Sequence, residues 1–204
     1  MKLSNICKFE IMLNTNLIIE ERSRDIGEFT VGRLLPYRKK RMIGPFIFID
    51  HMRPATLGKD KLMGIDQHPH IGLATLTYLL HGELMHADSI GTLQRIRPGE
   101  VNLMIAGQGV THTERTPNEL IGRAHVMEGY QIWIALPKNM EDLQAEFHHL
   151  NADEMPSWKE GDLDIKLIVG SVFDKQSKLC LWSDLFLLEV FVNQDTFIDL
   201  GGDL

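Results

Sequence analysis

Cysteine is scarce in this sequence of 204 residues, which has only Cys7 and Cys180, far apart along the chain. Two distant cysteines exclude the disulfide framework of a small secreted protein, so we expect a reduced, cytoplasmic setting. Long apolar runs are missing as well. No stretch approaches the roughly 18 residues that span a membrane, and no membrane partner is expected.

The N-terminal segment lacks the features of a signal peptide. Lys8 and Glu10 interrupt its apolar residues, and no small-residue cleavage site follows them. We therefore expect neither a signal peptide nor a membrane anchor in this segment. Met12 is an alternative to Met1 as the true start of the protein.

The chain also lacks an excess of positive charge. Lys and Arg number 21 against 28 Asp and Glu, which gives a net charge of −7. Surfaces that bind nucleic acid are normally basic, so direct binding to nucleic acid is not expected, whereas binding to a protein that itself holds DNA stays open. The one basic run, YRKKRM at 37–42, is interpreted as a solvated loop.

Sustained helical periodicity is absent from the longer segments. Instead, runs rich in Val, Ile, Phe, Tyr and Thr recur between Gly, Pro and Asp turns, among them FTVGRLLP, PFIFIDHM and GYQIWIALP. This pattern predicts an all-β sandwich or barrel, and a jelly roll is one such arrangement. The polar stretch 137–162 predicts a linker between a first domain at 1–136 and a shorter segment at 163–204.

Two pairs of polar residues carry the strongest functional signal. His68 and His70 are spaced i, i+2, and so are His112 and Glu114, 42 residues after His70. Residues at this spacing point to the same face of a β-strand, so two neighbouring strands can aim three imidazoles and one carboxylate at a single point. A lone histidine in a strand is ordinarily a surface or core residue, but two such pairs favour a metal site.

This set of side chains suits one divalent metal ion. Imidazole nitrogen and carboxylate oxygen are ligands for iron, manganese, nickel, copper and zinc, and the residue types do not choose among these metals. Positions left open on the ion would take water, dioxygen or a chelating substrate. Glu114 has two candidate roles, as a metal ligand and as the general base toward a bound hydroxyl group.

Several neighbouring residues have weaker signals. His86 and Asp88 either line the pocket or build a turn, in which Asp caps its own backbone. Leu76 and Tyr78 share strand parity with His70, so we expect them in the apolar barrel interior. Trp133 is expected to be a core residue rather than a platform for substrate.

Longer motifs around these residues resemble the pirin family of the cupin superfamily. The segments HPHIGLATLTYLLHGELMHADSIG and IRPGEVNLMIAGQGVTHTE carry the resemblance, with support from RSRDIGEFTVGRLLP, GPFIFIDHMRPA and QIWIALP. The resemblance extends from about Arg22 to about Val192. It implies a double cupin with one iron-type centre in the N-terminal barrel, and the family's ligands match His68, His70, His112 and Glu114.

The family resemblance implies more than one activity. Some pirin-like proteins act as quercetin 2,3-dioxygenases on a phenolic substrate, whereas others are described as transcription-linked cofactors or as regulators of metabolic enzymes. We therefore expect an Fe(II)-dependent dioxygenase, an oxidoreductase in which Glu114 is the catalytic residue. The alternatives are a non-catalytic, metal-dependent regulator that binds protein partners, and a degenerate, truncated pirin.

Three features depart from the family pattern. Ala74 stands where many pirins have Glu, which is expected to alter the pocket floor and leave the ligands intact. Glu128 stands where many relatives have His. Family members also continue well beyond residue 204, so we expect a complete N-terminal barrel and only the opening strands of a second cupin. Unpaired strands in that segment predict packing on the first barrel or self-association.

Overall fold

The computed structural model describes residues 17–26, 30–58, 62–179 and 181–196. Both candidate starts, Met1 and Met12, lie outside these residues, and so do Cys7 and Cys180. The described regular structure is β apart from two short 3-10 helices, η1 (Asn118–Leu120) and η2 (Lys138–Met140). In the described part of the chain, neither helix has the length or apolar character to cross a membrane. The prediction of an all-β fold is confirmed.

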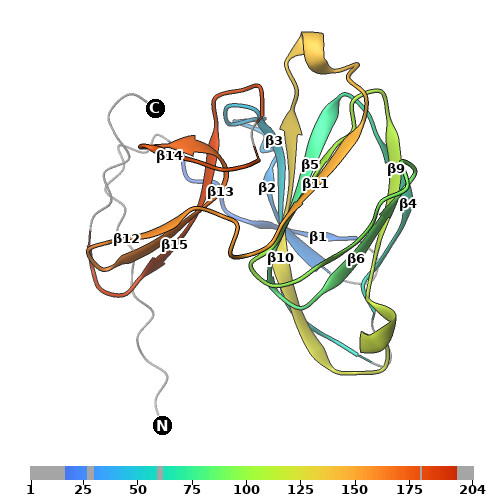
Figure 1. The fold of residues 1–204 in the computed structure, drawn as a ribbon. Helices are drawn as coiled ribbons and strands as arrows, with labels where there is room; N and C mark the ends of the chain where they lie inside the picture. Colours follow the sequence, from blue (N-terminus) through green and yellow to red (C-terminus); the bar gives the residue numbers. More distant parts are fainter. Residues whose placement is uncertain (1–16, 27–29, 59–61, 180, 197–204) are drawn as a thin grey trace.

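A seven-stranded antiparallel sheet forms the middle layer of the molecule (Figure 1). Its strands, in spatial order, are β1 (Arg22–Asp25), β2 (Thr30–Leu35), β3 (Phe46–Leu57), β10 (His125–Ala135), β5 (Leu73–His81), β8 (Val101–Ile105) and β11 (Glu146–Leu150).

Two smaller sheets lie on either side of this layer (Figure 1). The first has the order β4 (Gly64–His70), β9 (Val110–Arg115), β6 (Leu84–Asp88) and β7 (Leu93–Ile96), and it closes the barrel. The second contains β12 (Ser157–Glu160), β13 (Leu163–Val172), β14 (Lys175–Gln176) and β15 (Phe186–Val192), which pairs with β13.

Strand β5 is buried on both faces because it runs through the middle layer. On one face, Leu76 and Tyr78 pack with Ile168 and Val169 of the second small sheet. On the other face, Thr77 and its neighbours point into the barrel toward the first small sheet. A continuous run of buried residues is what a strand between two covering layers requires.

The prediction that Leu76 and Tyr78 fill the barrel interior is therefore wrong, although both side chains are buried. Parity with His70 does not carry over, because a turn at Gly72 takes the chain from one sheet into another. The residues of β5 that do point into the barrel are those that alternate with Leu76 and Tyr78, such as Thr77 and Leu79. The apolar end of the barrel consists of Val31, Met52, Leu57, Met63, Leu79, Leu84, Ile96 and Met127.

The polar stretch 137–162, expected to be a linker, contributes a strand to each of two sheets. Strand β11 pairs with β8 of the large sheet, and β12 pairs with β13. In EFHHL, Glu146 and His148 are exposed and Phe147 and His149 are covered on the other face, while Leu150 at the strand end is buried in a different apolar cluster. This alternation allows a mostly polar segment to form an edge strand. The domain limits 1–136 and 163–204 stay a prediction.

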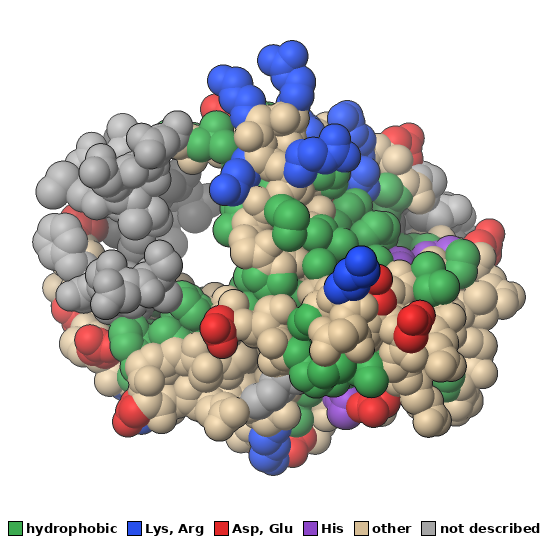
Figure 2. Space-filling view, turned by 90° about the horizontal axis from the view of Figure 1, so that it is seen from above, with side chains coloured by type: hydrophobic (Ala, Val, Ile, Leu, Met, Phe, Trp, Pro, Cys, Tyr) green, Lys and Arg blue, Asp and Glu red, His purple; other side chains and the backbone are tan. Residues whose placement is uncertain are grey.

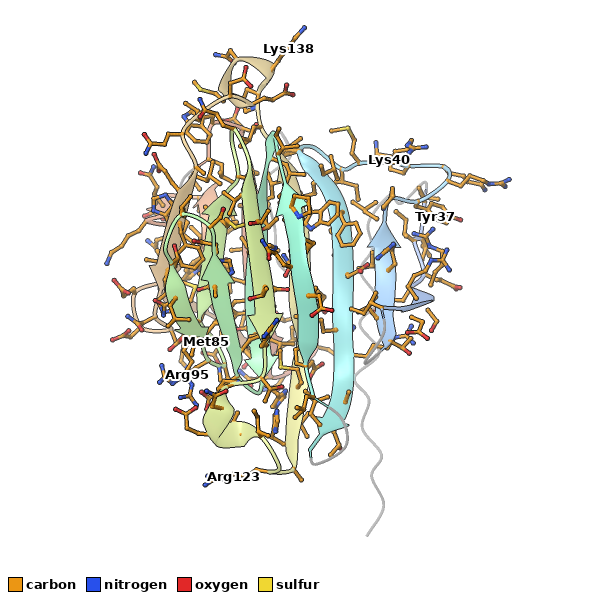
Figure 3. The ribbon with its side chains drawn as sticks, turned by 90° about the vertical axis from the view of Figure 1, so that its right-hand side faces the viewer. Tyr37, Lys40, Met85, Arg95, Arg123 and Lys138 are labelled. Atoms are coloured by element: carbon orange, nitrogen blue, oxygen red, sulfur yellow. The ribbon has the colours of Figure 1, made fainter. Side chains whose placement is uncertain are left out.

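The basic run at 37–42 lies in the connection between β2 and β3, where Tyr37 and Lys40 form a tight turn. Residues 38–42 of this turn are exposed, as expected of a solvated loop. Figure 2 shows Lys and Arg side chains gathered along one side of the face it presents. In Figure 3, Lys40 lies near Tyr37 at the right-hand side of the molecule, and Met85 and Arg95 mark the paired strands β6 and β7.

Candidate metal centre

Strands β4 and β9 position the predicted ligands, because they are antiparallel neighbours. His68 lies directly opposite His112, so both side chains leave the same face of the sheet. His70 and Glu114 each lie two residues further along, in opposite directions from this central pair. Each two-residue step spans about 7 Å, so His70 and Glu114 leave the sheet about 14 Å apart along the strands.

Three of the four predicted residues meet at one point. A nitrogen from each of His68, His70 and His112 lies within 4.8 Å of the others. Their ring centroids are 4.4 to 5.0 Å apart. The Glu114 carboxylate does not join this set within that distance. It belongs instead to a second cluster with His86 and His112, also within 4.8 Å of one another.

Hydrogen bonds leave ligand atoms free at two of the imidazoles. His68 Nδ1 lies 2.8 Å from the backbone carbonyl oxygen of Asp66. Because a carbonyl only accepts, Nδ1 carries the proton and Nε2 keeps its lone pair. His112 Nε2 is buried, and no described group forms a hydrogen bond with it. An unpartnered buried nitrogen is costly unless something such as a metal ion satisfies it.

Burial also sets the charge of these side chains. It lowers the pKa of His70 to about 4 and the pKa of His112 to about 3, with a further contribution from neighbouring imidazoles. Both rings are therefore neutral near pH 7, which is the form that binds a metal. Burial raises the pKa of Glu114 to about 7, against the opposing effect of its hydrogen bond with Thr77.

His86 and Asp88 lie directly behind His112. His86 Nδ1 is 3.3 Å from His112 Nδ1, and His86 Nε2 is 3.0 Å from Asp88 Oδ2. Asp88 also accepts the backbone N–H groups of Ile90 and Thr92, so it forms a turn as well as contacting the site. Burial would raise the pKa of Asp88, but the hydrogen bonds from His86 and Thr92 lower it on balance.

The histidines open into a cavity of about 170 Å³ inside the barrel. Its walls are mainly apolar and come from β2, β3, β4, β9 and β10. The lining residues are Ile26, Val31, Arg33, Phe48, Asp50, Met52, Ile65, His68, His70, His112, Glu114, Gln131 and Trp133.

Trp133 lines this cavity, so the expectation that it is a core residue is wrong. Its ring stacks on Phe48 at 4.1 Å and meets His70 edge-on at 5.0 Å. The sequence could not assign this role, because strand β10 has large apolar side chains on both faces. Alternation fixes which residues share a face but does not say which face lines a pocket.

Arg33 and Asp50 form a charged pair on the same wall. Arg33 Nε and Nη2 each donate to one oxygen of the Asp50 carboxylate at 2.8 Å. The guanidinium also lies over the Phe48 ring, 4.5 Å from its centroid. Sequence reasoning missed this pair and also missed Gln131, whose side-chain oxygen is 2.9 Å from Thr77 Oγ1. No short motif joins these residues, since strand pairing alone brings them together.

Comparison with known proteins agrees with the fold. The pirin family model matches residues 28–134, which is more than half of the chain. The chain belongs to the pirin family. A pirin-like protein from Caulobacter vibrioides is 46% identical over 176 residues, which cover 84% of this chain and 60% of that protein.

Solved structures that are similar to this chain share its cupin fold. A crystal structure of quercetin 2,3-dioxygenase from Acinetobacter baumannii has a TM-score of 0.80 and 36% sequence identity, covering 87% of this chain and 57% of that one. Another structure of the same name and source has a TM-score of 0.76 and 26% identity, covering 84% and 62%. This chain therefore spans about 60% of the length of these relatives.

Proposed function

We propose that this pirin-family chain binds one divalent metal ion, Fe(II), and acts as a dioxygenase on quercetin or a similar phenolic compound. The observation that carries the proposal is the meeting of three imidazoles, from His68, His70 and His112, at the wall of an apolar cavity. A homologous structure named as a quercetin 2,3-dioxygenase supports the choice of substrate class.

The donor set fits a borderline divalent metal. Two of the imidazoles are buried and neutral, and the unpartnered His112 Nε2 is available as a ligand. Glu114 lies outside the three-histidine set, so it would join His68, His70 and His112 as a fourth ligand only if its side chain turned toward the ion. A bound iron ion would supply Lewis-acid and dioxygen chemistry, which side chains alone do not provide.

The cavity walls suit one end of an aromatic substrate. Trp133, which stacks on Phe48 and lies beside His70, gives this wall an aromatic ring, and aromatic substrates pack against such rings. The volume of about 170 Å³ is below the roughly 300 Å³ typical of a complete ligand pocket. We therefore infer that the oxygen-bearing end of the substrate enters the cavity, and that the remaining ring stays near the mouth.

Glu114 is the proposed catalytic base for the hydroxyl group of the substrate. In the metal-free protein, burial raises the pKa of Glu114 to about 7, so its carboxylate accepts a proton more readily than an exposed glutamate does. Thr77 Oγ1 is 3.3 Å from Glu114 Oε1 and 2.9 Å from Gln131 Oε1. Its hydroxyl has one proton, so Thr77 donates to Glu114 only when it releases Gln131.

The test begins with elemental analysis of protein purified without added metal. The protein is then loaded anaerobically with iron, exposed to air with quercetin, and followed by loss of the flavonol absorbance. We expect one metal ion per chain and turnover that His70→Ala abolishes. His148→Ala, which changes an exposed histidine outside the site, should behave as the native protein does.

Absence of turnover would contradict the enzyme proposal if a folded sample failed with iron, manganese, copper and nickel alike. Metal binding without turnover would instead favour the non-catalytic regulator. Because the chain covers 57% of the similar dioxygenase, both measurements must use this chain itself.

A further inference from the structure

We propose that Asp88 and His86 are positioning residues, which hold the ring proton of His112 on Nδ1 and thereby present Nε2 to the metal. This inference rests on the proposed metal centre, because it concerns how one of the ligands is prepared. It assigns a role to two buried side chains that would not themselves contact the metal.

The three side chains form a continuous line behind the site. Asp88 Oδ2 is 3.0 Å from His86 Nε2, and His86 Nδ1 is 3.3 Å from His112 Nδ1. Strand pairing sets this line, because β6 and β9 are neighbours and place Asp88 opposite His112. The Asp88 and His86 side chains are 0% and 5% exposed, so water does not compete for these contacts.

The direction of each hydrogen bond follows from the carboxylate. Asp88 Oδ1 accepts the backbone N–H groups of Ile90 at 3.1 Å and Thr92 at 2.9 Å, which holds Oδ2 toward His86. An ionised carboxylate only accepts, so the proton of His86 lies on Nε2. A neutral imidazole has one N–H group, and His86 Nδ1 must therefore accept from His112 Nδ1–H. The lone pair of His112 is left on Nε2.

The same hydrogen bonds decide between the two overlapping clusters. His86, His112 and Glu114 lie close enough to hold a metal, but both ring nitrogens of His86 already have hydrogen-bond partners. His112 Nε2 has none. The metal therefore belongs on the Nε2 side of His112, with His68 and His70, and His86 supports the site from behind.

Replacement of Asp88 by Asn tests this role with little change in shape. The Asn oxygen can still accept the N–H groups of Ile90 and Thr92, which preserves the turn. Its amide nitrogen now donates to His86 Nε2, so the proton of His86 moves to Nδ1. Two N–H groups cannot face each other at 3.3 Å, and His112 must move its own proton to Nε2, where the metal would bind.

The first readout is the tautomer of His112 in the metal-free protein, measured by long-range ¹H–¹⁵N correlation NMR. We expect Nδ1–H in the native protein and Nε2–H in Asp88→Asn. The second readout is the affinity for nickel(II) alone, measured by calorimetry. Loss of an outer partner of a metal-bound histidine typically weakens binding about 10- to 100-fold, and we expect a loss in this range.

Asp164→Asn provides a matched control, because Asp164 is a half-buried carboxylate on strand β13 of the second small sheet, outside the barrel. It should change neither readout. His86→Phe is a second variant for the case in which Asp88→Asn fails to fold, since a Phe ring can keep the contact with Phe147 at 4.6 Å. It removes the acceptor for His112 Nδ1–H, so both tautomers of His112 should appear and nickel affinity should fall.

An Nε2–H tautomer of His112 in the native protein would overturn the inference. An Asp88→Asn variant with native tautomer and native nickel affinity would overturn it as well. Failure of the metal centre has a different signature: the native protein would show Nδ1–H on His112 and still bind no nickel. That result would support the proton placement and contradict the proposed function.

Discussion

The barrel and the second small sheet bury different kinds of side chain. Among the described residues, every buried polar or charged side chain except Ser177 lies between Asp50 and Thr116, inside or beside the barrel. The second small sheet contributes mainly apolar residues to the interface with the large sheet. Burying polar groups costs stability unless they are paired, and the unpartnered His112 Nε2 is the buried group of the barrel that indicates a bound ligand.

The largest effect is expected when a buried polar residue of the barrel is replaced by an apolar one. His112→Phe removes the imidazole shared by both clusters and fills its space with an apolar ring. We expect loss of detectable nickel binding in calorimetry. Thermal unfolding of the metal-free protein should change little, because the substitution removes the unpartnered His112 Nε2 but also the Nδ1 contact with His86. A clear loss of metal-free stability would mean that His112 is a packing residue.

Truncation of a buried apolar residue tests the interface between the large sheet and the second small sheet. Leu76 is 0% exposed and packs against that sheet, so Leu76→Ala should lower the free energy of unfolding by about 2–5 kcal/mol. Leu93→Ala, at a site 72% exposed, is the control and should change it by less than about 0.5 kcal/mol. Denaturant titration measures both. Nickel stoichiometry should be unchanged in both variants, and a loss of metal in Leu76→Ala would show that the two regions are coupled.

The pH dependence of metal-free stability sharpens the role of Glu114. Its pKa is about 7 in the folded protein against an ordinary value of 4.5, so the folded state binds this proton more tightly. The resulting stabilisation is fully present below pH 4.5 and is lost as pH rises through 7. It amounts to about 3 kcal/mol at most.

Comparison with Glu114→Gln isolates this contribution, because the histidines affect both proteins alike. The native protein should lose stability relative to Glu114→Gln between pH 4.5 and pH 8 in urea titrations. A constant difference across this range would show that the Glu114 carboxyl group titrates normally.

The smallest expected effect concerns the exposed side of the second small sheet. Phe191 on β15 is 60% exposed. We predict that the chain self-associates through this strand, and that Phe191→Glu reduces association in sedimentation velocity while changing the unfolding free energy by less than about 0.5 kcal/mol. A native protein that remains monomeric at high concentration would contradict this prediction.

Much of the site geometry could be predicted from the sequence, because strands repeat every two residues. That period is enough to put His68 and His70 on one face, and the same holds for His112 and Glu114. The separation of Glu114 from His70 could not be predicted. It depends on which residues pair across β4 and β9, including an irregularity between Ile65 and His68.

The sequence also could not predict features that depend on contacts between sheets. Parity failed for Leu76 because β4 and β5 belong to different sheets. The role of Trp133 depended on which face of β10 lines the cavity. His86 was recognised as a neighbour of the site, but its contact with His112 required the pairing of β6 with β9. Periodicity describes one strand at a time, whereas these contacts are set by the order of strands.

The most direct test of the account is anomalous diffraction from crystals of the metal-loaded protein. We predict a single peak per chain, about 2 Å from His112 Nε2 and from one ring nitrogen of each of His68 and His70. A peak on the opposite side of His112, within coordination distance of His86, would contradict the account. Crystals soaked at saturating metal with no peak in the barrel would contradict it equally.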